Sequence, residues 1–422
     1  MNFRIIIYLT AVIISSHGMM AQKLSLQECL TLAEQESPLA KQKLYFESME
    51  ALTQKNVSSG FLPTFSINGQ ASYQSDVFSF PNNPAFDSPI IPKDQYRITL
   101  DVQQKIYDGG LTKNKKIAES ARIANESSTV EVDLYEIKET ITQLFFSTLI
   151  YQENIIILRN LLTDLGEQRK KIEAQVANGM VLPGNLLAFK KQILSVEQQI
   201  LSAEMEQVAL LDMLGQWIGR DLDTADELQV PNGDLPIYQS EIDRPEIRLL
   251  KSQDRYWESM KKLSESGTRP MLWAVAQGGV GQPNTYNFLE TDLSDFYFIG
   301  LKLSWQLFDY GNGRREKEIY AARQGIVQSK LEHLTDNFDR KLTREYMEVR
   351  KLEALVAKDE ELLLMQNQIV ASAFSQLSNG VITPTEYLSE LNSQTQLEVN
   401  RKIHLLKLKQ AQYNCLNITG KL

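Results

Sequence analysis

The sequence has few of the residues that build metal sites and disulfide frameworks. Its 422 residues include two cysteines, Cys29 and Cys415, and three histidines, His17, His333 and His404. The histidines do not form a cluster with the spacing of metal ligands, so we expect no metal site. Both cysteines fall on apolar faces of predicted helices. We interpret them as buried small hydrophobic residues, with a disulfide in an oxidising compartment as the alternative.

The sequence also lacks a catalytic constellation. Serines are scattered over predicted helix faces, acidic residues have surface spacing, and no glycine-rich loop follows a strand to cradle a phosphate. The formal net charge of −9 argues against nucleic acid as a partner, because Lys and Arg are scattered among a larger number of Asp and Glu and cannot neutralise a phosphate backbone. We therefore expect no catalytic residues, no cofactor and no enzymatic activity.

Long apolar runs are missing beyond the first residues. Residues 1–21 have Arg4, an apolar run from Ile5 to Ile14 and small residues ending at Ala21, which is typical of a secretory signal peptide. The run is too short to span a bilayer, although an uncleaved anchor is the alternative. No later stretch approaches about 20 consecutive apolar residues. We expect an exported protein that no membrane helix holds.

What the sequence does contain is an internal repeat of its turn and helix-end motifs. At an offset of 201 residues, Ile106–Gly110 returns as Leu307–Gly311, and Ala177–Pro183 returns as Ser378–Pro384. At an offset of 207 residues, Ser37–Lys41 matches Arg244–Arg248, and Leu62-Pro63 matches Arg269-Pro270. Turn and helix-end motifs that recur at constant spacing indicate one structural unit used twice. The difference between the offsets places a length change in a loop between Pro63 and Asp108.

Asp108 and Asp309 open the long helical segment of each repeat. The motif Asp108-Gly109-Gly110 could form a phosphate-binding nest. Because Asp309 occupies the same place after a predicted strand, a helix N-cap explains both motifs and is the favoured interpretation.

Each repeat contains a predicted antiparallel helical hairpin. Apolar residues recur at alternating steps of three and four, as in a coiled coil, from Leu134 to Val176 and from Phe338 to Leu377. Thr148 and Arg169 interrupt the first seam, and the second is broken by Glu345, Asp359 and Gln366. Asn-Gly ends each outgoing helix and a proline opens the return helix. An outgoing helix of 71 residues would be about 105 Å long.

Before each hairpin the apolar period changes from 3.6 to 2, which predicts two strand pairs. The expected strands cover about 62–75, 94–107, 270–281 and 295–308. Each is long enough for a membrane strand with one apolar and one polar face. The residues expected to face lipid are Tyr96, Ile98, Leu100, Tyr297, Ile299, Leu301, Leu303 and Trp305. A small sheet packed on a helical body explains the alternation equally well. Four strands cannot close a barrel, so membrane strands would require several chains.

The order of signal, helices, strand pair and long hairpin, with all but the signal repeated, resembles the TolC family of trimeric outer-membrane efflux proteins. The resemblance covers essentially the whole mature chain. It rests on the duplicated spacing and on several short motifs: Leu24–Leu30 with Ser37-Pro38, the two strand-to-helix junctions, the two Asn-Gly tips, Ala411–Asn414 and Thr419-Gly420.

The resemblance implies a mainly helical fold with β-strands, built of duplicated coiled-coil hairpins and two strand pairs. Three chains would form a twelve-stranded β-barrel on an α-helical barrel. It also implies a homotrimer that acts as the passive exit duct of a tripartite efflux pump or type I secretion system. Its partners would be outer-membrane lipid, a periplasmic adaptor (membrane fusion) protein and an inner-membrane pump of RND or ABC type.

The hairpin ends supply the other predicted sites. Apolar residues follow both Asn-Gly tips, and we expect an adaptor to cover them or, alternatively, a neighbouring hairpin to pack on them. The predicted docking residues are Asn178, Gly179, Met180, Val181, Leu182, Asn379, Gly380, Val381 and Ile382. The resemblance places the periplasmic gate at Glu386, with Glu390 nearby and Ser389 at the family's second acidic position. Equally, Glu386 is a solvated residue of a first helical turn.

These observations give a first repeat over 22–220 with its hairpin at 108–220, a linker at 221–244, and a second repeat over 245–422 with its hairpin at 309–422. The linker would be an equatorial belt. Two rival classes remain: an exported trimeric coiled-coil structural or adhesion protein, and a periplasmic adaptor of the same pumps. The duplicated strand pairs argue against both.

Overall fold

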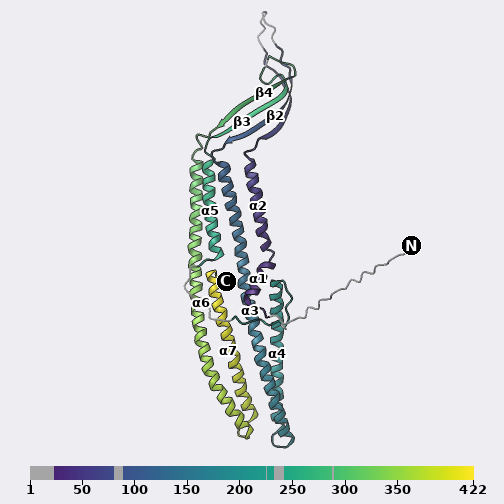
Figure 1. Cartoon of the computed structure of the whole chain (residues 1–422), viewed down its shortest axis with the longest axis vertical. Helices are drawn as coiled ribbons and strands as arrows, with labels where there is room; N and C mark the ends of the chain where they lie inside the picture. The colour runs from purple at the N-terminus through teal and green to yellow at the C-terminus, as the bar shows by residue number, and fades with distance from the viewer. Residues whose placement is uncertain (1–22, 80–88, 225, 232–241, 288) are drawn as a thin grey trace, which may run out of the picture. The chain divides into compact units, whose positions relative to one another are not determined.

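The computed structural model describes residues 23–79, 89–224, 226–231, 242–287 and 289–422. The predicted signal peptide lies outside this range, as do residues 80–88 of the loop between β1 and β2 and residues 225 and 232–241 of the 221–244 linker. Figure 1 labels the elements, which are α1 (Leu26–Glu36), α2 (Ala40–Ser59), β1 (Thr64–Tyr73), β2 (Asp94–Tyr107), α3 (Leu111–Ala177), α4 (Pro183–Ile218), α5 (Pro245–Ser266), β3 (Met271–Gln282), β4 (Ser294–Ser304), α6 (Asn312–Ser378) and α7 (Pro384–Thr419).

The offsets between the two sequence repeats also relate the bounds of the helices and strands. Adding 201 to both bounds of α3 gives those of α6, and the same shift converts α4 into α7. The strand registers obey the two offsets as well. Thr64 pairs with Gln103 in the first strand pair, and Met271 pairs with Ser304 in the second, which are the positions 207 and 201 residues further on.

Two compact units make up the chain, and each draws on both repeats. The hairpin unit consists of 1–37, 136–240 and 341–422, and the sheet unit consists of 38–135 and 241–340. Helices α3 and α6 therefore each contribute one part to the hairpin unit and one part to the sheet unit.

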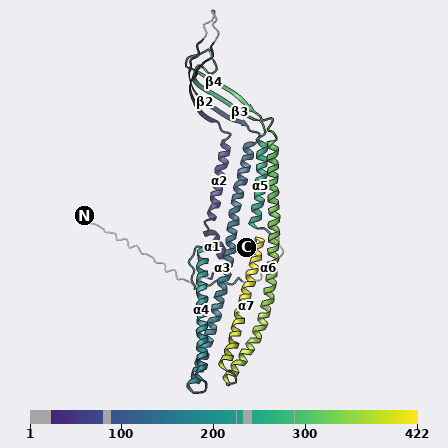
Figure 2. The same ribbon diagram turned by 180° about the vertical axis from the view of Figure 1, so that it is seen from behind.

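The sheet unit contains one antiparallel sheet in the order β1-β2-β3-β4. Side-chain hydrogen bonds order its helices as α2, α3, α5 and α6, and both views show this order (Figures 1 and 2). Trp257 of α5 stacks against Tyr320 of α6, and the Arg323 guanidinium lies 4.4 Å from the Trp257 ring centroid. These contacts join the two helices of the second repeat.

The hairpin unit has the buried apolar core that the heptad pattern predicts. Phe145, Phe146 and Leu149 of α3 are fully buried, and Phe146 lies against Tyr413 of α7 at 5.7 Å between ring centroids. One 18-residue stretch of α3 has a mean hydropathy of 1.2, and 56% of it is buried within the chain. Burial of this kind is what a core helix requires, because the apolar side chains already have partners.

Two of the polar residues that interrupt the helical seams, Thr148 and Asp359, are paired within the hairpin unit. Thr148 is buried and donates to its own helix at Leu144 O, 2.9 Å away. Asp359 of α6 is buried and lies 2.6 Å from Nδ1 of His404 on α7. An unpaired buried polar group would lower the stability of the fold. These hydrogen bonds therefore explain how the apolar seams accommodate Thr148 and Asp359.

The two cysteines are free and buried, which confirms the favoured interpretation. Burial raises the pKa of the Cys29 thiol to about 12 and that of Cys415 to about 11. Both side chains are therefore neutral and unreactive at neutral pH, as expected for small core residues.

Candidate functional site

The predicted lipid-facing residues within the strands share one face of the sheet. Leu100 of β2 pairs with Ile67 of β1 and with Gly278 of β3, and Leu301 of β4 pairs with Ala274 of β3. The eight predicted side chains are 47–79% exposed in the single chain. The apolar face therefore runs unbroken across four strands, and none of the described residues covers it.

Trp305 lies just beyond the described end of β4. Alternation of apolar residues continues past this point and predicts a strand to 308, but β4 ends at Ser304. The partner strand β3 begins opposite, at Met271, so residues 305–308 have no strand to pair with in the described chain. The end of a strand is set by its partner, which sequence alternation does not report.

The opposite face of the sheet carries a polar network around Asp101. Its carboxylate accepts hydrogen bonds from Asn68 at 2.6 Å, from Thr99 at 2.9 Å and from Gln277. Arg97 donates to Gln70 on the same face at 2.7 Å. Sequence alternation predicts polar residues here but not this network, because its members come from three strands.

Aromatic side chains also lie on this second face. Phe296 and Phe298 of β4 pack around Tyr286 with ring centroids 5.5 and 5.8 Å apart, and the Tyr286 hydroxyl donates to Gln277. The face is therefore polar along β1 and β2 and mixed toward β4. A sheet with one apolar and one largely polar face is suited to the boundary between lipid and water.

At the tips, glycine ends both outgoing helices in the left-handed region, with φ of 70° at Gly179 and 71° at Gly380. Side chains with a Cβ are disfavoured there, which explains the Asn-Gly signal. Met180, Leu182 and Val381 are 68–76% exposed. The tips thus present apolar surface, as the sequence predicts.

Val181 and Ile382 differ from the other predicted tip residues. Both are partly buried and pack against a cluster beneath the tips. This cluster joins α3, α4, α6 and α7 and includes Leu165, Phe189, Ala373, Tyr387 and Leu391. Val181 and Ile382 therefore hold the tips to the core, and the exposed docking surface reduces to Met180, Leu182 and Val381, with the polar residues beside them.

Glu386 is bonded within its own helix end. Its carboxylate accepts from the Thr383 backbone N–H at 2.7 Å and from the Thr383 hydroxyl at 2.9 Å, while Glu386 N–H donates back to that hydroxyl. This is a capping box, which satisfies two orphan donors at the start of α7. The structure thus confirms the helix-start role, and the gate role stays a prediction.

Hydrogen bonds from the backbone and the side chain of Thr383 lower the pKa of Glu386. They favour the ionised carboxylate because they are donated to it. In a trimer, neighbouring Glu386 carboxylates around a threefold axis would raise one another's proton affinity, because like charges at close range disfavour ionisation. Within one chain the local bonds act in the opposite direction.

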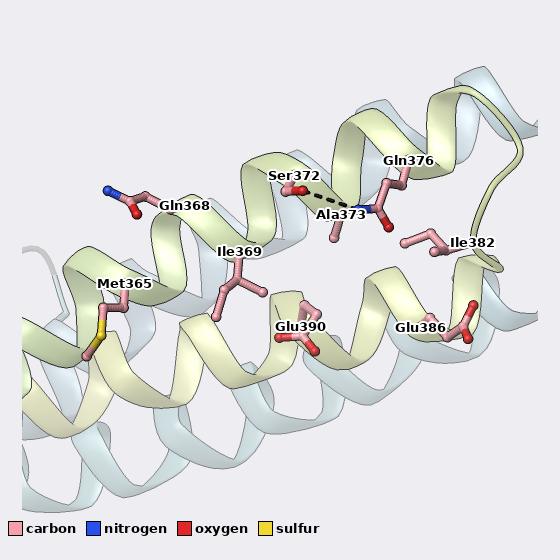
Figure 3. Close-up of a pocket in the computed structure, with 9 residues that line it drawn as sticks. All are labelled: Met365, Gln368, Ile369, Ser372, Ala373, Gln376, Ile382, Glu386 and Glu390. Carbon is pink, nitrogen blue, oxygen red and sulfur yellow. Dashed lines mark hydrogen bonds between the residues drawn. The ribbon is translucent and has the colours of Figure 1, made fainter.

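Glu390 lies one turn further along α7 and is half-buried. Gln366 of α6 donates to its carboxylate at 2.8 Å and to its backbone carbonyl at 3.0 Å. Figure 3 shows Glu386 and Glu390 lining an open groove between α6 and α7, together with Ile369 and Ile382. The groove thus places two carboxylates beside apolar side chains near the second tip.

Asp108 and Asp309 are helix N-caps, as favoured. Asp108 accepts from the backbone N–H groups of Gly110 and Thr112 at 3.0 and 2.8 Å, and Asp309 accepts from Gly311 and Gly313 at 2.9 and 2.8 Å. Burial raises the pKa of Asp108, but these bonds outweigh it and leave that pKa lowered. The amides of Gly110 and Gly311 in these motifs are thereby already occupied.

No protein-family model and no curated protein sequence matches this chain. Solved structures do match. The outer membrane protein VceC of Vibrio cholerae has a TM-score of 0.67 at 15% identity over 93% of this chain and 96% of its own. The CmeC outer membrane channel of Campylobacter jejuni has 0.68 at 13% over 94% and 85%, and the outer-membrane channel OprN has 0.69 at 13% over 94% and 90%. The chain therefore has the fold of TolC-like outer-membrane channels, which confirms the predicted fold of the single chain, while the trimeric barrel stays a prediction.

Proposed function

We propose that this protein is the outer-membrane duct of an export system, through which cargo leaves the cell passively. The observation that carries the proposal is the apolar face that spans all four strands of a chain with a channel fold. Exposed side chains such as Ile98 and Leu301 would be costly in water as a continuous patch. In a bilayer they are the surface that a membrane strand requires.

The proposed assembly is a homotrimer. In the described chain, β1 and β4 each pair on one side only, so the sheet has two open edges. Lipid does not tolerate such edges, because their N–H and C=O groups would lack partners. Three chains would supply twelve strands and could close the sheet, with the polar face around Asp101 toward the interior.

The rival classes explain less. A coiled-coil adhesion protein would account for the hairpins but not for a four-stranded sheet with an uncovered apolar face. A periplasmic adaptor would need only one hairpin, whereas this chain has two of equal length. Both rivals would place the sheet in water.

At the hairpin tips, we propose that a periplasmic adaptor contacts Met180, Leu182 and Val381 and couples the duct to an inner-membrane pump. The exposure of these three side chains supports a docked partner, since apolar tips in water are unfavourable. We further propose that Glu386 and Glu390 contribute charge to the constriction near the second tip. A ring of carboxylates would attract cations.

Membrane fractionation with channel recording tests the proposal. The protein should sediment with the outer membrane, resist extraction by high salt, and produce discrete conductance steps when it is reconstituted into a planar bilayer. A protein found in the soluble periplasmic fraction would refute the duct. A membrane-bound protein that never conducts, even after the tips are loosened by replacing Tyr387 with alanine, would argue for an adhesive or structural role.

A further inference from the structure

The turn that follows β3 folds over the largely polar face of the sheet. Asn284 is 7% exposed and organises this turn. Its Oδ1 accepts from the backbone N–H groups of Tyr286 and Asn287, both at 2.9 Å. Its Nδ2 donates to Ser294 Oγ at 2.9 Å, which ties the turn to the start of β4. We call residues 283–287 the Tyr286 turn.

The Tyr286 ring forms a second layer of side chains on this face. Phe296 and Phe298 of β4 form the first layer, and the Tyr286 ring lies against them with ring centroids 5.5 and 5.8 Å apart. Its hydroxyl donates to Gln277 of β3 at 2.9 Å. Phe296 beneath it is 7% exposed, whereas Tyr286 is 52% exposed. Tyr286 therefore projects from the face while its hydroxyl stays bonded to the sheet.

The network around Asp101 positions the acceptor of that hydrogen bond. The side-chain nitrogen of Gln277 donates to the Asp101 carboxylate, which also accepts from Asn68 and Thr99. An amide side chain carries its donor and its acceptor on opposite arms. Because the donor arm of Gln277 is bound to Asp101, its oxygen is directed toward Tyr286. The polar strands thus hold the Tyr286 turn in place.

Two glycines make room for the first layer of rings. A Cβ on Gly300 would lie 2.8 Å from Cζ of Phe298, and a Cβ on Gly281 would lie 3.2 Å from Cε1 of Phe296. Both distances are shorter than the usual separation of packed carbons. The missing side chains therefore allow the phenylalanine rings to lie against the strands, where Tyr286 packs on them.

The first repeat has polar pairs at the matching positions. Arg97 donates to Gln70 at 2.7 Å, and Gln74 donates to Gln95 at 3.2 Å. In the second repeat, phenylalanines replace Gln95 and Arg97 at the 201-residue offset, and a glycine replaces Gln74 at the 207-residue offset. A polar face alone would not require these exchanges. They remove the cross-strand polar pairs and create the aromatic surface that receives Tyr286.

We propose that Tyr286 is a latch that holds its turn inside the outer mouth of the duct, where it limits the size of solutes that enter from outside. This inference rests on the proposed duct. Strands β2 and β4 continue into α3 and α6, which carry the periplasmic hairpins, so the turn lies at the outer end of the strands. Each chain of the assembly contributes one latch, from its second repeat.

The strength of the latch suits a reversible barrier. One hydrogen bond and two ring contacts hold the Tyr286 side chain, and each contributes modestly to stability in water. The turn can therefore swing off the face when cargo leaves and return afterwards, without unfolding of the sheet. Small polar solutes pass the latch in either state.

Labelling of intact cells with maleimides tests the latch in the full-length protein. Lys302 lies on the same face four residues beyond Phe298, about 13 Å further along the strand, so Lys302→Cys reports access past the latch. Exposed Gln74 follows the outer end of β1, so Gln74→Cys reports access before it. The native Cys29 and Cys415 are buried and should stay unlabelled.

The two reporters should distinguish reagents by size. A small charged maleimide should label both, and a maleimide on a long polyethylene glycol chain should label only Gln74→Cys. Adding Tyr286→Ala should raise the polymer labelling rate at Lys302→Cys by about tenfold or more, because the hydrogen bond and both ring contacts are lost. Tyr286→Phe keeps the ring contacts and should raise the rate less.

A pair of glycine variants leaves Tyr286 itself in place. Gly300→Ala should displace the Phe298 ring and thereby raise polymer labelling at Lys302→Cys. Gly69→Ala makes the same exchange on β1, where a Cβ would meet no atom within 4 Å, and should leave the labelling unchanged. Labelling of Lys302→Cys by the small maleimide shows that each variant has assembled.

The outcomes separate the latch from the duct. Equal polymer labelling of Lys302→Cys with and without Tyr286→Ala, while the small maleimide still labels it, would overturn the latch and leave the duct intact. Equal rates in Gly300→Ala and Gly69→Ala would overturn the role of the aromatic surface in holding Tyr286. A Lys302→Cys reporter that the small maleimide never labels would refute a water-filled interior and, with it, the proposed duct.

Discussion

Gln366 of α6 donates two hydrogen bonds to Glu390 of α7, one to its carboxylate at 2.8 Å and one to its backbone carbonyl at 3.0 Å. Gln366 is one of the polar residues that interrupt the predicted seam of α6, and it is 8% exposed. The interruption is therefore a tie between the two helices of the second hairpin. It also fixes the carboxylate proposed to contribute charge near the gate.

Replacing Gln366 with alanine should destabilise the second hairpin. The half-buried Glu390 carboxylate would lose a charge-assisted hydrogen bond, which is typically worth about 1.5–3 kcal/mol. Thermal unfolding of the purified protein would show a lowered melting temperature. Gln368→Ala is the matched control because Gln368 is exposed on the same helix. Equal melting temperatures for the two variants would show that the Gln366–Glu390 hydrogen bonds do not stabilise the second hairpin.

Leu301→Arg should prevent stable insertion. An arginine on the lipid side of a membrane strand costs about 2–4 kcal/mol near the bilayer midplane. The amount of assembled protein in isolated outer membranes should therefore fall. Lys302→Gln, one residue away on the opposite face, should assemble normally and change the conductance. If both variants insert equally well, the apolar face does not contact lipid.

Replacing Met180, Leu182 and Val381 together with aspartate should abolish export and leave the assembly intact. These side chains are exposed, so the changes remove apolar docking surface without disturbing the cluster under the tips. Val181 is left unchanged because it packs against that cluster. Gln198→Asp adds a charge at an exposed position on the same hairpin, away from the tip, and should export normally. Normal export by the triple variant would mean that the adaptor binds elsewhere.

Glu386→Gln should reduce the cation selectivity of single channels and weaken block by multivalent cations added from the periplasmic side. Glutamine can still complete a capping box, so the charge is removed while the helix start is kept. Glu28→Gln is the matched control, since Glu28 forms the same capping box with Ser25 at the start of α1. Unchanged selectivity in Glu386→Gln would restrict Glu386 to its helix-start role.

Acid should weaken the second tip through the same residue. Bonds from Thr383 lower the pKa of Glu386 from its ordinary value of 4.5. A group with a lowered folded-state pKa stabilises above its unfolded pKa, and that contribution is lost as the pH falls through the folded value. The melting temperature should therefore fall more below about pH 4.5 in the parent protein than in Glu386→Gln. Parallel pH profiles for the two proteins would contradict this assignment.

The sequence predicts features that depend on local chemistry. Gly179 and Gly380 mark the hairpin tips because a left-handed residue favours glycine, and Asp108 and Asp309 mark helix starts because their side chains cap the next turn. The Thr383–Glu386 capping box is equally local and could have been read from its spacing. It identifies the helix-start role of Glu386 and leaves the gate role a prediction.

Features that depend on distant partners were not predictable. The network around Asp101 joins residues from three strands, and Gln277 is 176 positions away in the chain. The end of β4 is set by where β3 begins, so alternation through Trp305 overextends the strand. The compact units combine parts of both repeats, because packing follows spatial neighbours and not the order of the duplication.

The mass of the native complex extracted from isolated outer membranes tests the central claim most directly. A mild detergent extract analysed by native mass spectrometry should give three times the mass of the mature chain. Three copies supply the twelve strands that a closed barrel needs with no open edge. A single chain, or a complex recovered only from the soluble periplasm, would contradict the proposal that this protein is a trimeric outer-membrane duct.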